Sequence, residues 1–305
     1  MKILTQSTPC VLTIGKFEGI HLGHQALLAE VTHKAATLGI ASAAMVFDPH
    51  PYAFLKDSHY APLFTNEERH HILKNTNLDY LIIYPFTEIL TKMPPEDFCK
   101  IIFETYQAKL LIVGENYRFG SGRTGDTALL HKQAATYGAK LQIVPMTTTA
   151  TDKISTSHIR RLLSDSKIKE TQMLLGFRFF IFGIVSAGKQ LGRSLGFPTL
   201  NIYPSQEKLL PPDGVYSTMV TVNGTCYRGI TNIGLRPTVN STSTVRSVET
   251  HLPDYYGDSL YGEHIKVELL EFIRPERKFD SVEELRIQIA KDIMCIQTYG
   301  FANCN

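Results

Sequence analysis

Two histidines in a glycine-rich segment, residues 15–24, are the first residues whose types and spacing could carry chemistry. Gly15 and Gly23 allow a phosphate group to approach the backbone closely, because glycine has no side chain in the way. His21 and His24 can donate hydrogen bonds to phosphate oxygens as charge develops in a transition state. The segment precedes a helical pattern, and a helix N-terminus attracts anions. We therefore predict a phosphate site, although the short pattern alone fits a surface turn equally well.

Three further polar segments each follow an apolar run that predicts a strand. Ligands bind at the carboxyl ends of the strands in open α/β sheets, so these segments are candidates for the same site. They are residues 47–51, with Asp48 and His50; residues 113–126, with Asn116; and residues 154–160, with Thr156, Ser157 and Arg160. Asp48 and His50 fit a turn around Pro49 as well as they fit direct ligand contact.

The second half of the chain contains a glycine-dense segment, residues 183–201, that includes Gly188 and Gly192. Such a segment is compatible with a flexible phosphate-binding loop, but its glycine spacing alone favours turns between strands. The pattern GxxxxGK[ST] is absent, which excludes a P-loop enzyme. Glu249 is a separate candidate, because its carboxylate fits either a general base or a solvated strand surface.

The first half alternates short apolar runs with helical patterns. Strands are predicted at residues 11–14, 42–47, 80–84, 109–113 and 141–144, and helices at residues 24–38, 65–75, 94–106 and 127–137. Strands that alternate with helices predict a parallel sheet with crossover connections. Thr65 followed by Glu68 predicts a capping box at the start of the second helix.

The composition changes after about residue 175, where glycine, proline and β-branched residues become frequent. Strands are predicted at residues 177–185, 215–222, 226–230 and 265–272. Asn223-Gly224 predicts a two-residue hairpin turn, and residues 281–296 predict one long terminal helix. The predicted fold is α/β plus β: a parallel α/β domain, residues 1–175, then a small β-barrel with a terminal helix, residues 176–305.

The four segments of the first half, taken in order, closely resemble the adenylyltransferase module of prokaryotic bifunctional riboflavin kinase/FAD synthetases. This module is a Rossmann-like member of the HxGH nucleotidyltransferase superfamily, and the resemblance covers residues 10–170. It implies transfer of AMP from ATP to the phosphate of FMN, which yields FAD and pyrophosphate. It also implies phosphate-binding or catalytic roles for six donors: His21, His24, Asn116, Thr156, Ser157 and Arg160.

Two features depart from the usual pattern of that module. Glu18 stands where the family usually has aspartate, and the hydroxyl residues Thr156 and Ser157 are exchanged in order. The exchange keeps both hydroxyl donors. A phosphate oxygen of FMN is already a nucleophile and needs no general base, so catalysis would depend on positioning and charge stabilisation.

The second half resembles the riboflavin kinase family over about residues 176–292. The hallmark GRxLGFPTxN is present at residues 192–201, and further landmarks match at residues 214–216, 232–238, 249–262 and 278–281. The resemblance implies transfer of the γ-phosphoryl group of MgATP to the 5′-hydroxyl of riboflavin. It places Mg²⁺ on Thr199 and Asn201, whose neutral oxygens suit this cation. It makes Glu249 the base that accepts the proton of the alcohol.

The chain departs from the kinase family at three positions. Ala187 stands where histidine is frequent, and Pro253 and Ser259 alter the segment that follows His251-Leu252. Proline cannot donate a hydrogen bond to a sheet, so we expect an altered strand end or turn beside the flavin site.

Composition excludes several other classes of protein. Lys plus Arg number 31 and Asp plus Glu 29, for a formal net charge of +2, so no excess positive charge indicates a nucleic-acid or membrane partner. Five scattered cysteines without a CxxC pair argue against a zinc site and a disulfide framework. The first residues lack the apolar region of a signal peptide. We expect a cytoplasmic enzyme, monomeric or weakly oligomeric, whose partners are riboflavin, FMN, FAD and ATP.

Three hypotheses about function follow. The first is a bifunctional enzyme that converts riboflavin to FMN in the barrel and FMN to FAD in the α/β domain. The second is a monofunctional riboflavin kinase whose other half is weakened by Glu18. The third is a flavin-binding protein without turnover, which the candidate catalytic residues of both halves disfavour.

Overall fold

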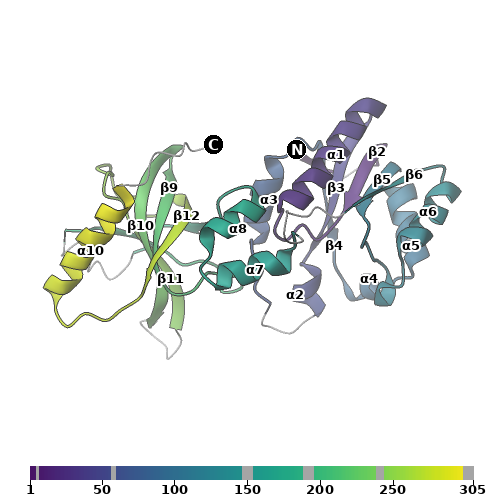
Figure 1. Cartoon of the computed structure of the whole chain (residues 1–305). Helices are drawn as coiled ribbons and strands as arrows, with labels where there is room; N and C mark the ends of the chain where they lie inside the picture. Colours follow the sequence, from purple (N-terminus) through teal and green to yellow (C-terminus); the bar gives the residue numbers. More distant parts are fainter. Residues whose placement is uncertain (5–6, 56–59, 146–153, 188–195, 238–243, 298–305) are drawn as a thin grey trace. The chain divides into compact units, whose positions relative to one another are not determined.

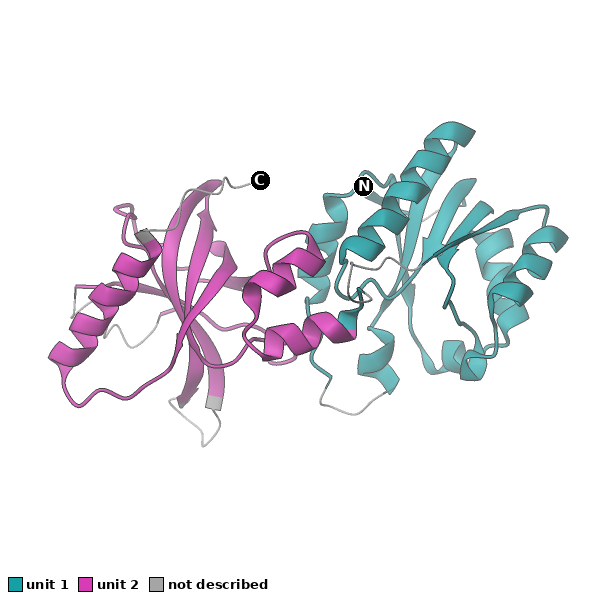
Figure 2. Cartoon of the chain, in the orientation of Figure 1, with its two compact units in different colours: residues 1–156 teal, residues 157–305 magenta. Residues whose placement is uncertain are grey.

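The computed structural model describes residues 1–305 except 5–6, 56–59, 146–153, 188–195, 238–243 and 298–305 (Figure 1). The chain forms two compact units, residues 1–156 and 157–305 (Figure 2). The helices α7 (Thr156–Ser164) and α8 (Ile168–Leu175), which our boundary at residue 175 assigns to the first domain, group with the second unit apart from Thr156. Packing explains this for α8, because Gln172 Nε2 donates to the carbonyl of Leu269 in the second sheet at 2.8 Å.

The first unit contains a six-stranded parallel sheet, as predicted, with strand order β1-β4-β3-β2-β5-β6. The strands are β1 (Lys2–Ile3), β2 (Cys10–Ile14), β3 (Ala41–Asp48), β4 (Tyr80–Pro85), β5 (Ala108–Gly114) and β6 (Lys140–Val144). The chain leaves β2 for β3 on one side and returns to β5 on the other. The carboxyl ends of β2 and β5 therefore flank a topological switch point, where open α/β sheets bind ligands.

Helices cover both faces of this sheet (Figure 1). They are α1 (Leu22–Leu38), α2 (Pro51–Leu55), α3 (Asn66–Lys74), α4 (Glu88–Lys92), α5 (Pro95–Lys100) with a π-helical continuation (Ile101–Thr105), a 3₁₀ turn (Ser121–Arg123) and α6 (Thr127–Thr136). Val11 and Leu12 of β2 belong to two different core clusters, because successive strand residues point to opposite faces. The capping box of α3 is confirmed: Glu68 N–H donates to Thr65 Oγ1 at 3.2 Å, and Thr65 N–H to Glu68 Oε2 at 2.8 Å.

The second unit contains a six-stranded antiparallel sheet with strand order β7-β12-β9-β10-β11-β8. The strands are β7 (Phe180–Ile184), β8 (Thr199–Ile202), β9 (Gly214–Val222), β10 (Thr225–Pro237), β11 (Thr244–His251) and β12 (His264–Pro275). A bridge between Ser186, just after β7, and Asn201 of β8 joins the two edge strands, with Ser186 N–H donating to Asn201 O at 2.8 Å. The sheet thus curls into the small barrel that we predicted.

The predicted hairpin and terminal helix of the second unit are confirmed. Asn223 (φ 49°) and Gly224 (φ 79°) join β9 and β10, and both occupy the positive-φ region that a type I′ turn requires. The helix α10 spans Val282–Gln297 and is capped by Ser281, whose Oγ accepts from Glu284 N–H at 3.2 Å. Ile296 of α10 packs on β9 and β10.

Some features differ from the expectations or were not foreseen. The short strands β1 and β8, and β11 with its polar residues, carry no clear periodicity in the sequence. Cys226 is disulfide-bonded, which its position in the sequence did not indicate, whereas Cys10 and Cys99 are free and buried. Within the described residues, none of the helices combines the length and the apolar character needed to cross a bilayer.

Candidate active sites

The first unit has a cavity of about 460 Å³ at the carboxyl ends of β2 and β5. We call it the histidine cavity. Six of the predicted phosphate-site residues line it, so the structure brings them together: Gly15, His21, Gly23, His24, Asn116 and Thr156. Among the described residues that line it, none is acidic. An anionic triphosphate therefore meets no opposing carboxylate there.

The loop between β2 and α1 is held in an unusual backbone conformation. Phe17 (φ 44°) and Ile20 (φ 43°) have positive φ values although neither is glycine, and both side chains are fully buried. A Cβ at Gly15 would lie 2.9 Å from the Phe17 ring, so only glycine fits above it. Residues in such sparsely populated conformations persist only where the surrounding structure fixes them, and they cluster at functional sites.

His21 and His24 stack on one another at the N-terminus of α1. Their ring centroids lie 3.9 Å apart with an interplanar angle of 13°. His21 is the N-cap, and its Nδ1 accepts the His24 N–H at 3.4 Å. An Nδ1 that accepts places the proton of the neutral ring on Nε2, which can then donate to a phosphate oxygen.

Burial keeps both imidazoles neutral near pH 7. It lowers the pKa of His21 to about 4 and that of His24 to about 3, and the neighbouring His21 contributes to the second shift. His24 Nδ1 is buried and has no hydrogen-bond partner among the described residues. This orphaned polar atom fits a site that is completed by a polar ligand.

The remaining predicted residues of the first site lie on two elements. Asn116 is exposed in the turn after β5. Thr156 begins α7, and its Oγ1 would lie 3.8 Å from a Cβ at Gly19 in the loop before α1. Ser157 and Arg160 follow on α7 in the second unit, and Arg160 shares the face of Thr156 because the two are four residues apart.

Three polar residues near the loop have structural partners instead of lining the cavity. Glu18 is 6% exposed, and its Oε1 accepts from Leu63 N–H at 3.4 Å. Asn66 Nδ2 donates to Asp48 Oδ1 at 2.7 Å. His50 Nδ1 accepts from the N–H of Tyr52 at 3.3 Å, as in a local turn.

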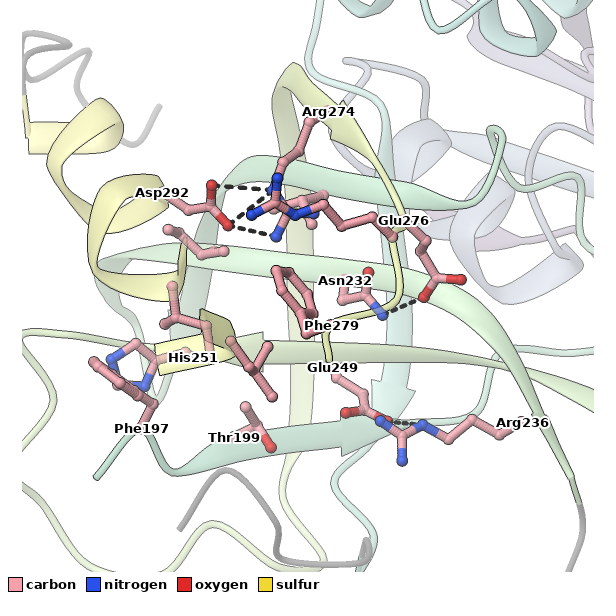
Figure 3. Close-up of a pocket in the computed structure, with 15 residues that line it drawn as sticks. Phe197, Thr199, Asn232, Arg236, Glu249, His251, Arg274, Glu276, Phe279 and Asp292 are labelled. Carbon is pink, nitrogen blue, oxygen red and sulfur yellow. Dashed lines mark hydrogen bonds and ion pairs between the residues drawn. The ribbon is translucent and has the colours of Figure 1, made fainter. Parts of the chain in front are cut away.

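The second unit has a cavity of about 340 Å³ between the sheet and α10 (Figure 3). We call it the glutamate cavity, because Glu249 of β11 lines it together with Thr199 of β8. Glu249 lies in register with Asn201 of β8, and His251 with Thr199. Residues directly opposite on neighbouring strands face the same side, so Thr199, Asn201 and Glu249 share one face of the sheet.

Glu249 is a largely buried carboxylate with charged neighbours in this cavity. Its side chain is 12% exposed and forms an ion pair with Arg236 Nε, and Ser247 Oγ donates to its Oε1 at 3.4 Å. Burial raises the pKa of Glu249, whereas Arg236 opposes the rise and Glu276 adds to it. Burial and neighbouring charges of this kind are typical of a carboxylate tuned for proton transfer.

Besides Arg277, four charged residues that line this cavity were not foreseen from the sequence. Arg236 precedes Pro237 within the family landmark at residues 232–238, which could have indicated it. Glu276 accepts from Asn232 Nδ2 at 2.6 Å, and a Cβ at Gly234 would clash with Glu276 Oε1. The other two, Arg274 and Asp292, form an ion pair between β12 and α10 for which no local sequence signal exists.

The second unit also contains the residues predicted to bind Mg²⁺ and the phosphates of ATP. Gly188 and Gly192 lie outside the described residues. The hydroxyl of Thr199, the amide of Asn201 and the carboxylate of Glu249 supply oxygen donors on one face, which is the donor chemistry that Mg²⁺ prefers. These residues therefore fit the cation that the kinase resemblance implies.

Comparisons with known proteins agree with both sites. The family model for FAD synthetase matches residues 3–158, and that for riboflavin kinase matches residues 175–299. The chain is 36% identical over 286 residues to the bifunctional riboflavin kinase/FMN adenylyltransferase of Escherichia coli K12, covering 93% of this chain and 90% of that protein. It is 32% identical to the protein of the same name from Bacillus subtilis 168, covering 95% and 92%.

A solved structure shares the fold over nearly the whole chain. It is described as a macrolide-efflux protein from Streptococcus pneumoniae, with a TM-score of 0.83 and 26% identity over 98% of this chain and 99% of that chain. The 32–36% identity to bifunctional enzymes over both matched regions, together with the two cavities, favours the first hypothesis, a bifunctional enzyme. The chain belongs to the bifunctional riboflavin kinase/FMN adenylyltransferase family, and it phosphorylates riboflavin to FMN and adenylylates FMN to FAD.

Proposed function

We propose that the histidine cavity carries out adenylyl transfer and that the glutamate cavity carries out phosphoryl transfer. The observation that supports this division is the distribution of acidic residues. Among the described residues, Glu249, Glu276 and Asp292 line the glutamate cavity and no acidic residue lines the histidine cavity. Only the attack of an alcohol needs a base, because the phosphate of FMN is already a nucleophile.

In the histidine cavity, a phosphate oxygen of FMN attacks the α-phosphorus of ATP, and the bond to the leaving pyrophosphate breaks. His21 and His24 donate hydrogen bonds to the phosphates, and their neutral state keeps one N–H on each ring for this purpose. Asn116 lies beside the reacting phosphates. Thr156, Ser157 and Arg160 hold the triphosphate and stabilise the charge of the pyrophosphate.

In the glutamate cavity, the 5′-hydroxyl of riboflavin attacks the γ-phosphorus of ATP, and ADP leaves. Glu249 accepts the proton of the hydroxyl as the new P–O bond forms. Thr199 and Asn201 hold Mg²⁺, which neutralises phosphate charge when it is bound. The resemblance to the kinase family supports a phosphate-binding role for Gly188 and Gly192.

The finer assignments of the chain belong to the same proposal. The adenylyltransferase domain extends to residue 175, because α7 carries Ser157 and Arg160, and the kinase domain begins at residue 176. The enzyme acts in the cytoplasm as a monomer or weak oligomer. The near balance of charge supports small-molecule partners and no nucleic-acid or membrane partner.

Single substitutions test the division of labour. Glu249→Gln should abolish formation of FMN from riboflavin and MgATP while FAD formation from supplied FMN continues. His24→Ala should do the reverse, so that FMN accumulates. Chromatography of the products measures both reactions in one sample. In each variant, the activity that is retained shows that the chain is still folded. Loss of both activities in one folded variant would contradict the proposal.

A further inference from the structure

A buried arginine of the first unit connects two loops near the histidine cavity without lining it. Arg69 lies on α3 and is 2% exposed. Its Nη1 donates to the carbonyl of Lys16 at 3.3 Å, and its Nη2 donates to the carbonyl of Phe47 at 3.2 Å. Nη2 also donates to Asn66 Oδ1 at 3.0 Å. One rigid guanidinium therefore joins the loop that follows β2 to the end of β3.

Neighbouring side chains offset part of the cost of burying the charged guanidinium. Burial lowers the pKa of Arg69, and Asp48, Tyr60 and Glu18 oppose this shift. Asp48 is itself held by Asn66, the first residue of α3. A buried charge is expensive to maintain without such partners. A leucine or methionine at this position would be buried at a lower cost in free energy. The presence of arginine therefore indicates a role for the rigid, planar set of N–H donors of the guanidinium.

The carbonyl that Arg69 holds belongs to the strained part of the loop. Lys16 lies between Gly15, which lines the histidine cavity, and Phe17, whose φ is 44°. The ammonium of Lys16 lies 3.5 Å from the centroid of the Tyr52 ring, so the residue is held at both ends. A loop conformation that costs free energy needs contacts of this kind to persist.

We propose that Arg69 is a positioning residue for adenylyl transfer: it holds the loop of residues 15–23 in the conformation that presents His21 and His24 to the phosphates. This inference rests on the proposed assignment of adenylyl transfer to the histidine cavity. Arg69 is not among the described residues that line the histidine cavity, so the role proposed for it acts through the loop. The departure at Glu18 belongs to the same arrangement, since that carboxylate contributes to the charge balance of Arg69.

The decisive measurement separates kcat from KM in Arg69 variants of the full chain. Arg69→Met removes the donors but keeps a long apolar stem. We expect kcat for FAD formation from FMN to fall about 10- to 100-fold, the scale of a small misplacement of catalytic groups, while the KM for ATP changes less than about threefold. Arg69→Lys, which can reach one carbonyl, should retain part of kcat. Millimolar guanidinium chloride should raise the activity of Arg69→Ala.

Controls separate this inference from general destabilisation and from the proposed function. Lys74→Met removes an exposed cation from the same helix and should leave adenylyl transfer unchanged. Riboflavin phosphorylation in the same sample should be unaffected in all Arg69 variants. If Arg69→Met does not fold, Arg69→Lys carries the test, with a reduced kcat at an unchanged unfolding temperature.

The outcomes that overturn the inference are distinct from those that overturn the proposed function. Full kcat in folded Arg69→Met, or equal rates in Arg69→Lys and Arg69→Met with no effect of guanidinium, would refute a positioning role. Retained adenylyl transfer in His24→Ala would refute the assignment of the histidine cavity itself.

Discussion

Arg274 and Asp292 attach the terminal helix α10 to β12, and breaking their ion pair should destabilise the second unit. Arg274 Nε lies 3.1 Å from both carboxylate oxygens and Nη2 lies 2.7 Å from Oδ2, which makes a bidentate pair (Figure 3). Gln288 Nε2 also donates to Asp292 Oδ1, at 2.7 Å. The Asp292 side chain is 3% exposed and that of Arg274 18% exposed, so a single substitution leaves a charge that water reaches poorly.

The expected cost follows from this burial. Removing one partner of a buried pair costs about 3–5 kcal/mol, and the partial exposure of Arg274 favours the lower end, about 3 kcal/mol. In a unit of this size 1 kcal/mol corresponds to roughly 2–4 °C in Tm. Asp292→Leu should therefore lower the unfolding temperature of the second unit by about 6–12 °C. Riboflavin kinase activity should fall with it, because both residues line the glutamate cavity.

Calorimetry of the full chain, with FMN adenylylation as the control for the first unit, provides the assay. Replacing both partners by apolar residues, Arg274→Met with Asp292→Leu, should recover most of the lost stability, because a buried pair contributes little over well-packed apolar side chains. Arg286→Met on the same helix breaks an exposed pair with Glu283 and should cost less than about 1 kcal/mol. The reasoning is refuted if Asp292→Leu costs no more than Arg286→Met, or if the double variant loses as much as the two single variants combined.

Two other substitutions in the second unit test its electrostatics and its packing. Glu249 must be ionised to act as a base, so kinase activity should fall as the pH drops through its raised pKa; Arg236→Met removes the cation that opposes the rise and should move this acid limb to higher pH. The pH profile of kcat/KM measures this. An acid limb of Arg236→Met that stays at the same pH as in the unaltered enzyme, or moves to lower pH, would contradict the reasoning. Gly229→Ala would put a Cβ 2.8 Å from Thr250 Cγ2 in the barrel core and should cost about 1–3 kcal/mol in chemical denaturation. An unchanged unfolding midpoint would contradict this prediction, because it would mean that the side chains around Gly229 move to accommodate the methyl group.

The local elements of this protein could be predicted from the sequence because the interactions that define them span only a few residues. The capping box of Thr65 and Glu68 and the turn at Asn223-Gly224 are examples, and both are present in the structure. The alternation of apolar runs and helical patterns likewise indicates a parallel sheet, since such runs must be buried on both faces. The motif at His21 and His24 predicted a phosphate site, and in the structure both histidines line one cavity.

Only the tertiary structure showed how distant segments meet. The strand order places β2 beside β5, which brings Asn116 to the histidines. The pairing of β8 with β11 brings Thr199 and Asn201 to Glu249, although the short β8 has no periodicity of its own.

The partners of the buried charged residues were also shown only by the tertiary structure. Arg69 is indistinguishable in the sequence from a solvated helix residue, and its role depends on carbonyls 53 and 22 residues away. Arg274 and Asp292 meet only because α10 folds back on β12. Local sequence determines propensities within a few residues, whereas burial and pairing of charges depend on how the whole chain packs.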